Sequence, residues 1–142
     1  MEIFVLSFAI FIACSSAVTI QEQRQQMIAI ATDCKTSTGA SDTDLTMLVL
    51  KKPIATKEGK CLLACIMETK KLIDGTKLNE KNFSDFVSIA AKNDVEITKK
   101  VTEIALECAK TDETDKCEMV AKFSPCLKKG MTTNKIKVDI GI

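Results

Sequence analysis

The sequence contains no histidine, no tryptophan and no tyrosine among its 142 residues. Without histidine, catalytic triads of the Ser-His or Cys-His type and histidine-containing zinc sites are excluded. A pair of carboxylates could still act as general acid and base, but no nucleophile motif accompanies them. We therefore predict no catalytic residue, no metal site and no cofactor. Polar contacts to any ligand are limited to Ser, Thr, Asn and charged side chains.

The chain also lacks a large excess of either charge. Its 20 basic residues are nearly balanced by 19 acidic residues, which gives a formal net charge of +1. The lysines are interleaved with Asp and Glu, a pattern typical of a solvated surface. Because there is no basic field of the kind that displaces counterions from a nucleic acid, we exclude DNA and RNA as partners.

A long apolar run lies at the start of the chain, from Ile3 to Ala13. Ser15 and Ala17 follow at the spacing that a signal peptidase accepts. Since a transmembrane helix needs about 20 apolar residues, the run is too short for a retained anchor. We interpret residues 1–17 as a cleaved secretory signal and residues 18–142 as one domain without stable membrane insertion. Acylation of Cys14, as in a bacterial lipoprotein, is the alternative.

Cleavage would remove Glu2 and Cys14 and leave 20 basic residues, 18 acidic residues, a net charge of +2 and six cysteines. An even number of cysteines in a secreted chain of this size predicts a disulfide framework. Cys61 and Cys65 lie one turn apart on one helix face, where a direct bridge would be strained. Each should therefore bond to a different partner. The remaining cysteines are Cys34, Cys108, Cys117 and Cys126.

Apolar residues recur at helical spacing through almost all of the mature chain. The first helix should bury one face that includes Ile28, and the second, after Ser41 as N-cap, should bury Leu45, Leu48 and Val49. Further helices are predicted from Thr56 to the turn at Asp74-Gly75, from Asn79, from Glu96 to Thr111, and from Asp115.

Two features should interrupt this helical pattern near the end of the chain. Pro125 removes a hydrogen bond to the carbonyl of Ala121, so it should kink or end the last helix. The tail KIKVDIGI, residues 135–142, alternates polar and apolar residues and should be extended. It is either a frayed terminus or a segment that folds over a cavity, with Ile and Val inward and Lys137 and Asp139 outward.

The gaps between the six cysteines are 26, 3, 42, 8 and 8 residues. This pattern resembles that of the insect odorant-binding proteins, the pheromone and general odorant-binding group. The segments CIMETKKLIDGTKLNEKNF and DKCEMVAKFSPCLKK strengthen the resemblance, which covers essentially the whole mature chain. It implies an all-α, compact six-helix bundle around an internal apolar cavity, stapled by three interlocked disulfides. Those disulfides would be Cys34 with Cys65, Cys61 with Cys117, and Cys108 with Cys126.

The resemblance also implies a secreted carrier of small hydrophobic ligands, such as odorants, pheromones or similar volatiles and lipids, in sensillum lymph or another body fluid. An odorant receptor is a second candidate partner, and the oligomeric state would be a monomer or a weak homodimer. The candidate ligand-lining residues are aliphatic, Met and Phe side chains: Leu48, Ile66, Met67, Phe83, Phe86, Ile89, Val101, Ile104, Met119, Val120, Phe123, Leu127 and Ile140. Since the same residues would fill the core of any bundle, we expect about half of them to contact ligand.

Three other functions stay open at this point. A salivary, venom or defence protein on the same scaffold would scavenge a foreign amphiphile, and a saposin-like protein would act on membranes. A small secreted enzyme is the third. Without histidine, any acid-triggered release must use Asp, Glu or a terminal carboxylate. Asn82-Phe83-Ser84 matches a glycosylation acceptor, which we expect to be unoccupied because Phe83 belongs to an apolar helix face.

Overall fold

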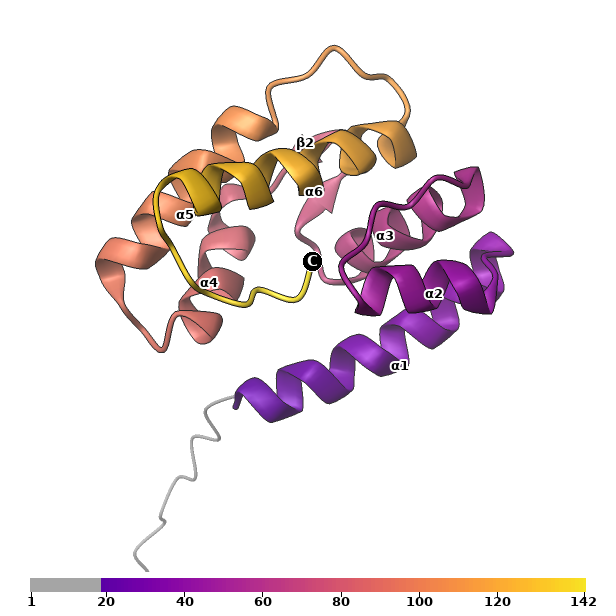
Figure 1. Ribbon diagram of the computed structural model, residues 1–142, viewed down its shortest axis with the longest axis horizontal. Helices are drawn as coiled ribbons and strands as arrows, with labels where there is room; N and C mark the ends of the chain where they lie inside the picture. The colour runs from indigo at the N-terminus through magenta and orange to yellow at the C-terminus, as the bar shows by residue number, and fades with distance from the viewer. Residues whose placement is uncertain (1–18) are drawn as a thin grey trace, which may run out of the picture.

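The computed structural model describes residues 19–142, so the predicted signal segment and Cys14 lie outside the described residues. Six helices occupy most of this part of the chain: α1 (Ile20–Thr38), α2 (Asp42–Val49), α3 (Lys57–Thr69), α4 (Glu80–Ala90), α5 (Val95–Cys108) and α6 (Lys116–Thr133). Helix α3 packs against α1, α2 and α6, and α5 packs against α4 and α6 (Figure 1). The predicted six-helix, all-α architecture is confirmed.

Each helix begins at a polar side chain that caps its backbone N–H groups. The caps are Thr19, Ser41, Thr56, Asn79, Asp94 and Asp115, and each side chain accepts a hydrogen bond from the first turn. The sequence indicated four of these starts directly, because a capping residue there precedes an apolar run. Helix α5 begins one residue earlier than predicted, at Val95.

Four helices end at a lysine in the left-handed conformation that usually favours glycine. Lys51, Lys71, Lys92 and Lys135 have φ between 52° and 57°. At each of them the next residue donates its N–H to a carbonyl five positions earlier, which is the Schellman arrangement. The predicted extent of α3 was therefore wrong. The helix ends at Thr69, and a short antiparallel hairpin, β1 (Ile73–Asp74) and β2 (Lys77–Leu78), forms the turn around Gly75.

Helix α6 continues through Pro125 to Thr133, so of the two predicted effects of the proline an end of the helix is wrong, while a kink stays a prediction. The proline leaves the carbonyl of Ala121 without its usual N–H donor, at a general cost of about 3 kcal/mol. Leu127 and Met131 beyond the proline are both buried, and Cys126 is bonded to Cys108 of α5. Packing and a covalent bond on the far side of Pro125 therefore hold the helix together.

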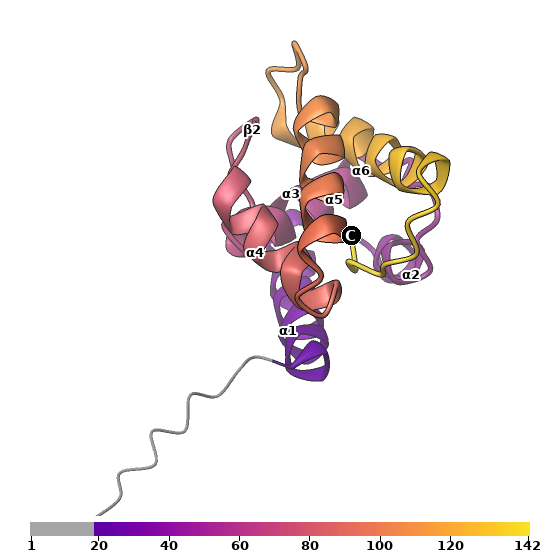
Figure 2. The ribbon, with the colours of Figure 1, turned by 90° about the vertical axis from the view of Figure 1, so that its left-hand side faces the viewer.

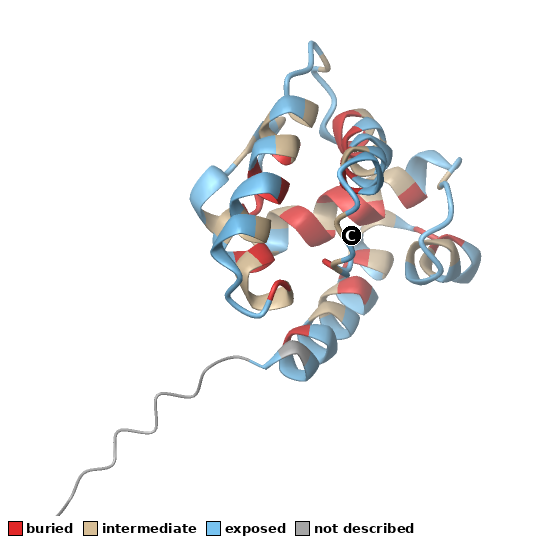
Figure 3. Ribbon diagram, turned by 60° about the vertical axis from the view of Figure 1, so that its left-hand side comes forward, coloured by how far each residue is buried: buried red, intermediate tan, exposed pale blue. Residues whose placement is uncertain are grey.

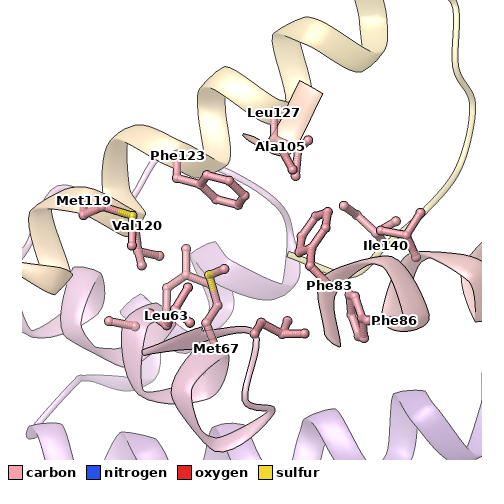
Figure 4. Packing of buried hydrophobic residues seen from close by; sticks show 14 of the residues in the cluster. Leu63, Met67, Phe83, Phe86, Ala105, Met119, Val120, Phe123, Leu127 and Ile140 are labelled. Atoms are coloured by element: carbon pink, nitrogen blue, oxygen red, sulfur yellow. The ribbon is translucent and has the colours of Figure 1, made fainter. Parts of the chain in front are cut away.

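The main core lies between α3, α4, α5 and α6, where the buried parts of these helices face the interior (Figure 3). Phe83 of α4 and Phe123 of α6 meet edge to face with ring centroids 6.0 Å apart. Figure 4 shows Met67 and Leu63 of α3 on the side of this core opposite α6. The interior is thus filled by aliphatic, Met and Phe side chains.

A second, smaller cluster fixes α1 to the rest of the fold. It contains Ala31 and Cys34 of α1, Ala40, and Leu62 and Ile66 of α3. Two predicted inward positions were wrong, since Ile28 is 61% exposed and Val49 is 69% exposed. Both lie at an edge of the apolar stripe, where one further step around the helix turns a side chain out to solvent.

Three disulfides connect the helices. Cys34 of α1 is bonded to Cys65 of α3, Cys61 of α3 to Cys117 of α6, and Cys108 of α5 to Cys126 of α6. These are the pairs that the family resemblance implies. Because the enclosed segments span 31, 56 and 18 residues, the chain-entropy model assigns roughly 3 to 4 kcal/mol to each bond. No helix within residues 19–142 is long and apolar enough to cross a membrane.

Candidate functional site

A cavity of about 500 Å³ lies beside the main core. Helices α3 and α6 form its inner wall, to which Leu63, Leu127 and Met131 contribute buried side chains. Residues 51–54, between α2 and α3, and residues 136–142 of the tail form its outer wall. The volume falls in the usual range for small-molecule sites, which is about 300 to 1,000 Å³.

The tail reaches the cavity because the chain reverses at the end of α6. Lys135 adopts φ 56°, and the N–H of Ile136 donates to the carbonyl of Met131 at 2.9 Å. The tail then runs back toward α2 and α3 (Figures 1 and 2). Its residues alternate as predicted. Lys137 and Asp139 are exposed, and the neighbouring Ile and Val side chains are partly or fully buried.

Ile140 is the most deeply buried residue of the tail, at 7% exposure. It belongs to the same apolar cluster as Phe83 and Phe86 of α4, and Figure 4 shows it beside both rings. Ile140 also lines the cavity. Ile136, Val138 and Ile142 also pack on the main core. The tail is therefore docked on the core by its apolar side chains, with Ile140 the most buried, and it forms one side of the cavity.

An ion pair joins the two parts of the outer wall. Lys51 contacts the carboxylate of Asp139, whose Oδ1 also accepts the N–H of Gly141 at 2.9 Å. The hydrogen bond from Lys51 holds the pKa of Asp139 below its usual value, and the N–H of Gly141 and the nearby charge of Arg24 act in the same direction against partial burial. The pair is largely exposed to solvent, so its contribution to stability is small.

The other end of residues 51–54 is fixed by a carboxylate that serves two helices. Asp44, in the first turn of α2, accepts the hydroxyl and the backbone N–H of Ser41 at 2.8 and 2.9 Å. It also accepts the hydroxyl of Thr56, the N-cap of α3. The hydrogen bond from Thr56 lowers the pKa of Asp44 most, and those from Ser41 add to it. Gly59 leaves room for this contact, since a Cβ there would collide with Ile54.

The buried side chains of the inner wall are all apolar, and its polar groups come mainly from α6. Ala121, Ser124 and Pro125 line the cavity side by side on this helix. Because Pro125 has no N–H, the carbonyl of Ala121 lacks its normal helical donor. This carbonyl and the side chains of Ser124, Lys128 and Thr132 are the polar groups that α6 contributes. The buried part of the wall can therefore enclose a hydrocarbon group without hydrogen bonds that would orient it.

The structure places three of the predicted lining residues, Leu48, Leu127 and Ile140, at the cavity. It places most of the others in the main core, which contains Met67, Phe83, Phe86, Val101, Met119, Val120 and Phe123. Ile66 lies in the α1 cluster, Ile104 packs on the main core beside Gly130, and Ile89 is half-buried on α4. Whether these core residues contact a bound ligand stays a prediction.

Sequence reasoning missed most of the outer wall. Ile54 follows Pro53 in a segment without helical periodicity. On the inner wall, Met131 was missed because it lies beyond the proline at which we expected α6 to kink or end. The alternation in the tail was the one signal that pointed to this wall. The Nδ2 atom of Asn82, the predicted unoccupied glycosylation position, donates to the carbonyl of Lys71 at 3.0 Å.

A helical domain with three interlocked disulfides and a mainly apolar cavity is typical of a small, disulfide-bonded protein that binds small molecules. The profile of the PBP/GOBP family matches residues 16–130. The chain belongs to this family, which confirms the resemblance noted in the sequence. The family and its solved structures support a carrier of small hydrophobic ligands.

Two curated relatives come from Drosophila melanogaster. General odorant-binding protein 19d is 28% identical over 119 residues, which cover 82% of this chain and 79% of the relative. General odorant-binding protein 28a is 31% identical over 110 residues, which cover 76% of this chain and 77% of the relative.

Solved structures show the same fold. An odorant-binding protein of Drosophila melanogaster, OBP28a, superimposes with a TM-score of 0.71 at 28% identity, covering 82% of this chain and 98% of that structure. A pheromone-binding protein of the cockroach Leucophaea maderae, in complex with the fluorescent reporter ANS, gives a TM-score of 0.65 at 19% identity. The match covers 80% of this chain and 98% of that structure.

Proposed function

We propose that this protein is a secreted carrier that binds one small hydrophobic molecule in the cavity between α3, α6 and the tail. The single observation that carries the proposal is a preformed cavity of about 500 Å³ with a mainly aliphatic wall. Family membership and the curated odorant-binding relatives support it. Odorants, pheromones and similar volatiles fit a site of this kind because burial of apolar surface contributes about 25 cal/mol per Å².

We place the carrier in an extracellular fluid, such as sensillum lymph, with residues 1–17 as its removed signal. Three disulfides support this location, because such bonds persist in oxidising compartments. The family is one of carriers, and we propose no catalytic role, no metal and no cofactor for this chain. A receptor partner and a monomeric or weakly dimeric state stay part of the proposal.

The test is displacement of a neutral fluorescent probe, N-phenylnaphthylamine, by a panel of apolar ligands of graded size. We expect saturable probe binding with one site per chain and displacement that strengthens with ligand apolar area until the cavity is full. Because the buried side chains of the wall are all apolar, close apolar analogues should differ modestly in affinity. No saturable probe binding, or binding that persists after the cavity is blocked by Met131→Trp, would contradict the proposal.

The tail should act as a removable side of the cavity. Truncation after Lys135 deletes Ile136, Val138, Ile140 and Ile142, all of which line the cavity or pack on the core. We expect faster ligand release and weaker affinity, measured by stopped-flow displacement of the same probe. Unchanged affinity and release rate would show that the tail is a terminus that docks without covering the ligand.

A further inference from the structure

The ionisable side chains that line the cavity are predominantly basic. They are Lys51, Lys52, Lys60, Lys128, Lys137 and Asp139. Two of the lysines are neutralised, since Lys51 pairs with Asp139 and Lys60 pairs with Glu118 at 3.0 Å. Lys52, Lys128 and Lys137 have no carboxylate within salt-bridge distance among residues 19–142. We refer to these three residues as the mouth lysines, because all three are exposed at the open edge of the cavity.

The net positive charge of residues 19–142 is concentrated at the mouth lysines, because basic and acidic residues nearly cancel elsewhere. All 20 basic and 18 of the 19 acidic residues lie within residues 19–142, a net charge of +2. The side chains around the cavity alone carry three uncompensated positive charges. A free main-chain carboxylate at Ile142, which also lines the cavity, would still leave two. The excess charge of this part of the chain is therefore gathered at the mouth of its cavity.

The sequence did not indicate this cluster. The lysines alternate with acidic residues along the chain, which predicted a solvated surface, and the mouth lysines are indeed exposed. The mouth lysines come from the turn after α2 and, more than 70 residues later, from the second half of α6 and the tail. The Nζ atom of Lys128 also donates to the carbonyl of Lys51 at 3.5 Å, so α6 and the turn meet at the mouth.

Like charges around one cavity repel one another, and their field is stronger beside a low-dielectric wall than in open water. An anion at the mouth would relieve this repulsion. Among the lining side chains it would meet no free carboxylate, because Asp139 is engaged by Lys51. Immediately behind the mouth the wall is aliphatic, formed by side chains such as Leu127, Met131 and Val138. The site thus combines an anion-attracting edge with an apolar interior.

We propose that the cavity selects amphiphiles with a negatively charged headgroup, of which a long-chain fatty-acid carboxylate is the simplest. The hydrocarbon chain lies against the inner wall, and the carboxylate faces Lys52, Lys128 and Lys137. This inference rests on the proposed carrier function and names the class of ligand. Because lysine binds an anion as a mobile point charge, the headgroup gains charge attraction without a fixed geometry.

The experiment compares three ligands that share one hydrocarbon chain: dodecanoate, dodecanol and methyl dodecanoate. Their affinities for the full folded chain are measured by displacement of neutral N-phenylnaphthylamine, below the concentration at which the ligands aggregate. We expect dodecanoate to bind roughly tenfold more tightly than the two neutral ligands at low salt, from three exposed ion pairs. Raising the salt from about 20 mM to about 500 mM should remove most of this preference.

A matched pair of triple variants locates the effect. Lys52→Gln, Lys128→Gln and Lys137→Gln together should reduce dodecanoate affinity roughly tenfold and change dodecanol affinity less than about twofold. The control is Lys77→Gln, Lys92→Gln and Lys100→Gln, which removes the same charge from exposed positions outside the cavity lining. The control should keep the preference for dodecanoate. Circular dichroism and thermal unfolding establish that both variants fold.

The outcomes separate this inference from the carrier function. Failure of the probe and of all three ligands to bind would contradict the carrier function and the headgroup site together. Saturable dodecanol binding without a preference for dodecanoate would contradict the headgroup site alone. Equal losses in the two triple variants would assign the preference to net charge and would also overturn it. Binding to phosphatidylglycerol vesicles without a dodecanoate preference would reassign the mouth lysines to a membrane surface.

Discussion

The two sides of the cavity are held by different forces. The inner wall belongs to helices that disulfides join, since α1 is bonded to α3, α3 to α6 and α5 to α6. The outer wall, residues 51–54 and 136–142, contains no cysteine. One exposed ion pair and the packing of its Ile and Val side chains on the core hold the tail. This difference supports the proposal that the tail, rather than the inner wall, moves when a ligand enters.

The largest expected effect comes from cutting the bond between α3 and α6. The double variant Cys61→Ser, Cys117→Ser should lower the free energy of unfolding by about 4 kcal/mol, because this bond encloses 56 residues. Removing Cys108 and Cys126 opens an 18-residue loop and should cost about 3 kcal/mol. Urea unfolding measures both. A smaller loss for the longer loop would show that loop entropy does not set the stability of the inner wall.

A saturating ligand should partly compensate for either lost disulfide, because it binds the folded state. At a hundred times its dissociation constant, a ligand adds about 2.7 kcal/mol. Urea unfolding with and without dodecanol tests this. Equal midpoints in the two conditions would show that the cavity is not the ligand site.

Removing the anchor of the tail should have a smaller effect. Ile140→Ala deletes a side chain that is 7% exposed and should lower the free energy of unfolding by about 2 kcal/mol. It should also speed ligand release. Ile28→Ala is the matched control, because it removes the same atoms from a position that is 61% exposed, and its effect should stay within about 0.5 kcal/mol. Equal effects of the two substitutions would contradict a docked tail.

A lysine with positive φ follows a helix both beside the core, at Lys71, and at the start of the tail, at Lys135. Replacing either lysine by glycine should relieve the backbone strain there. Lys71→Gly on the core side should raise the free energy of unfolding by about 0.5 to 1 kcal/mol, since glycine adopts positive φ without a Cβ penalty. Lys135→Gly should instead slow the opening of the tail in hydrogen exchange. Lys100→Gly, in the middle of α5, should destabilise by about 1 kcal/mol. A destabilising Lys71→Gly would contradict the assignment of strain.

The smallest expected effect is that of low pH on the rate of ligand release. The pKa of Asp139 is lowered in the folded protein, so its pairing with Lys51 stabilises the docked tail above the unfolded pKa of about 3.9 and is lost below it. Ligand release should therefore be constant from about pH 7 to pH 5 and should accelerate only below about pH 4. Asp139→Asn should release faster at neutral pH and respond less to acid.

Asp44 titrates in the same range, because its pKa is also lowered. Circular dichroism at each pH separates loss of the tail from unfolding at the start of α2 and α3. Acceleration of release between pH 7 and pH 5 would point to a titrating group other than these two carboxylates.

The sequence predicted those parts of the fold that depend on local patterns. Capping residues at Ser41, Thr56, Asn79 and Asp115 preceded apolar repeats, so the helix starts could be read directly. Helix ends were harder. Glycine is the usual sign of a left-handed end, and here lysine takes that position at Lys51, Lys71, Lys92 and Lys135. Because Lys71 did not signal the end of α3, the helix was predicted to run on to Gly75 and the hairpin at residues 73–78 was missed.

The site was less predictable than the fold, for a geometric reason. A ligand-lining residue and a core residue share the same chemistry, so Phe83 and Leu127 were equal candidates although Leu127 alone of the two lines the cavity. The mouth lysines bring together Lys52 and two residues that lie more than 70 positions further along the chain, Lys128 and Lys137. Such convergence is a property of the tertiary structure, and composition along the chain does not carry it.

The carboxylate of Asp44 has a consequence for the direction in which the cavity opens. Because it accepts the hydroxyl of Ser41 at the start of α2 and that of Thr56 at the start of α3, the two helices cannot separate at this end without breaking the hydrogen bond from Thr56. Residues 51–54 are therefore tethered close to a fixed point. The tail is held by its apolar side chains and by Asp139 alone. We therefore expect the cavity to open by movement of the tail about the reversal after α6.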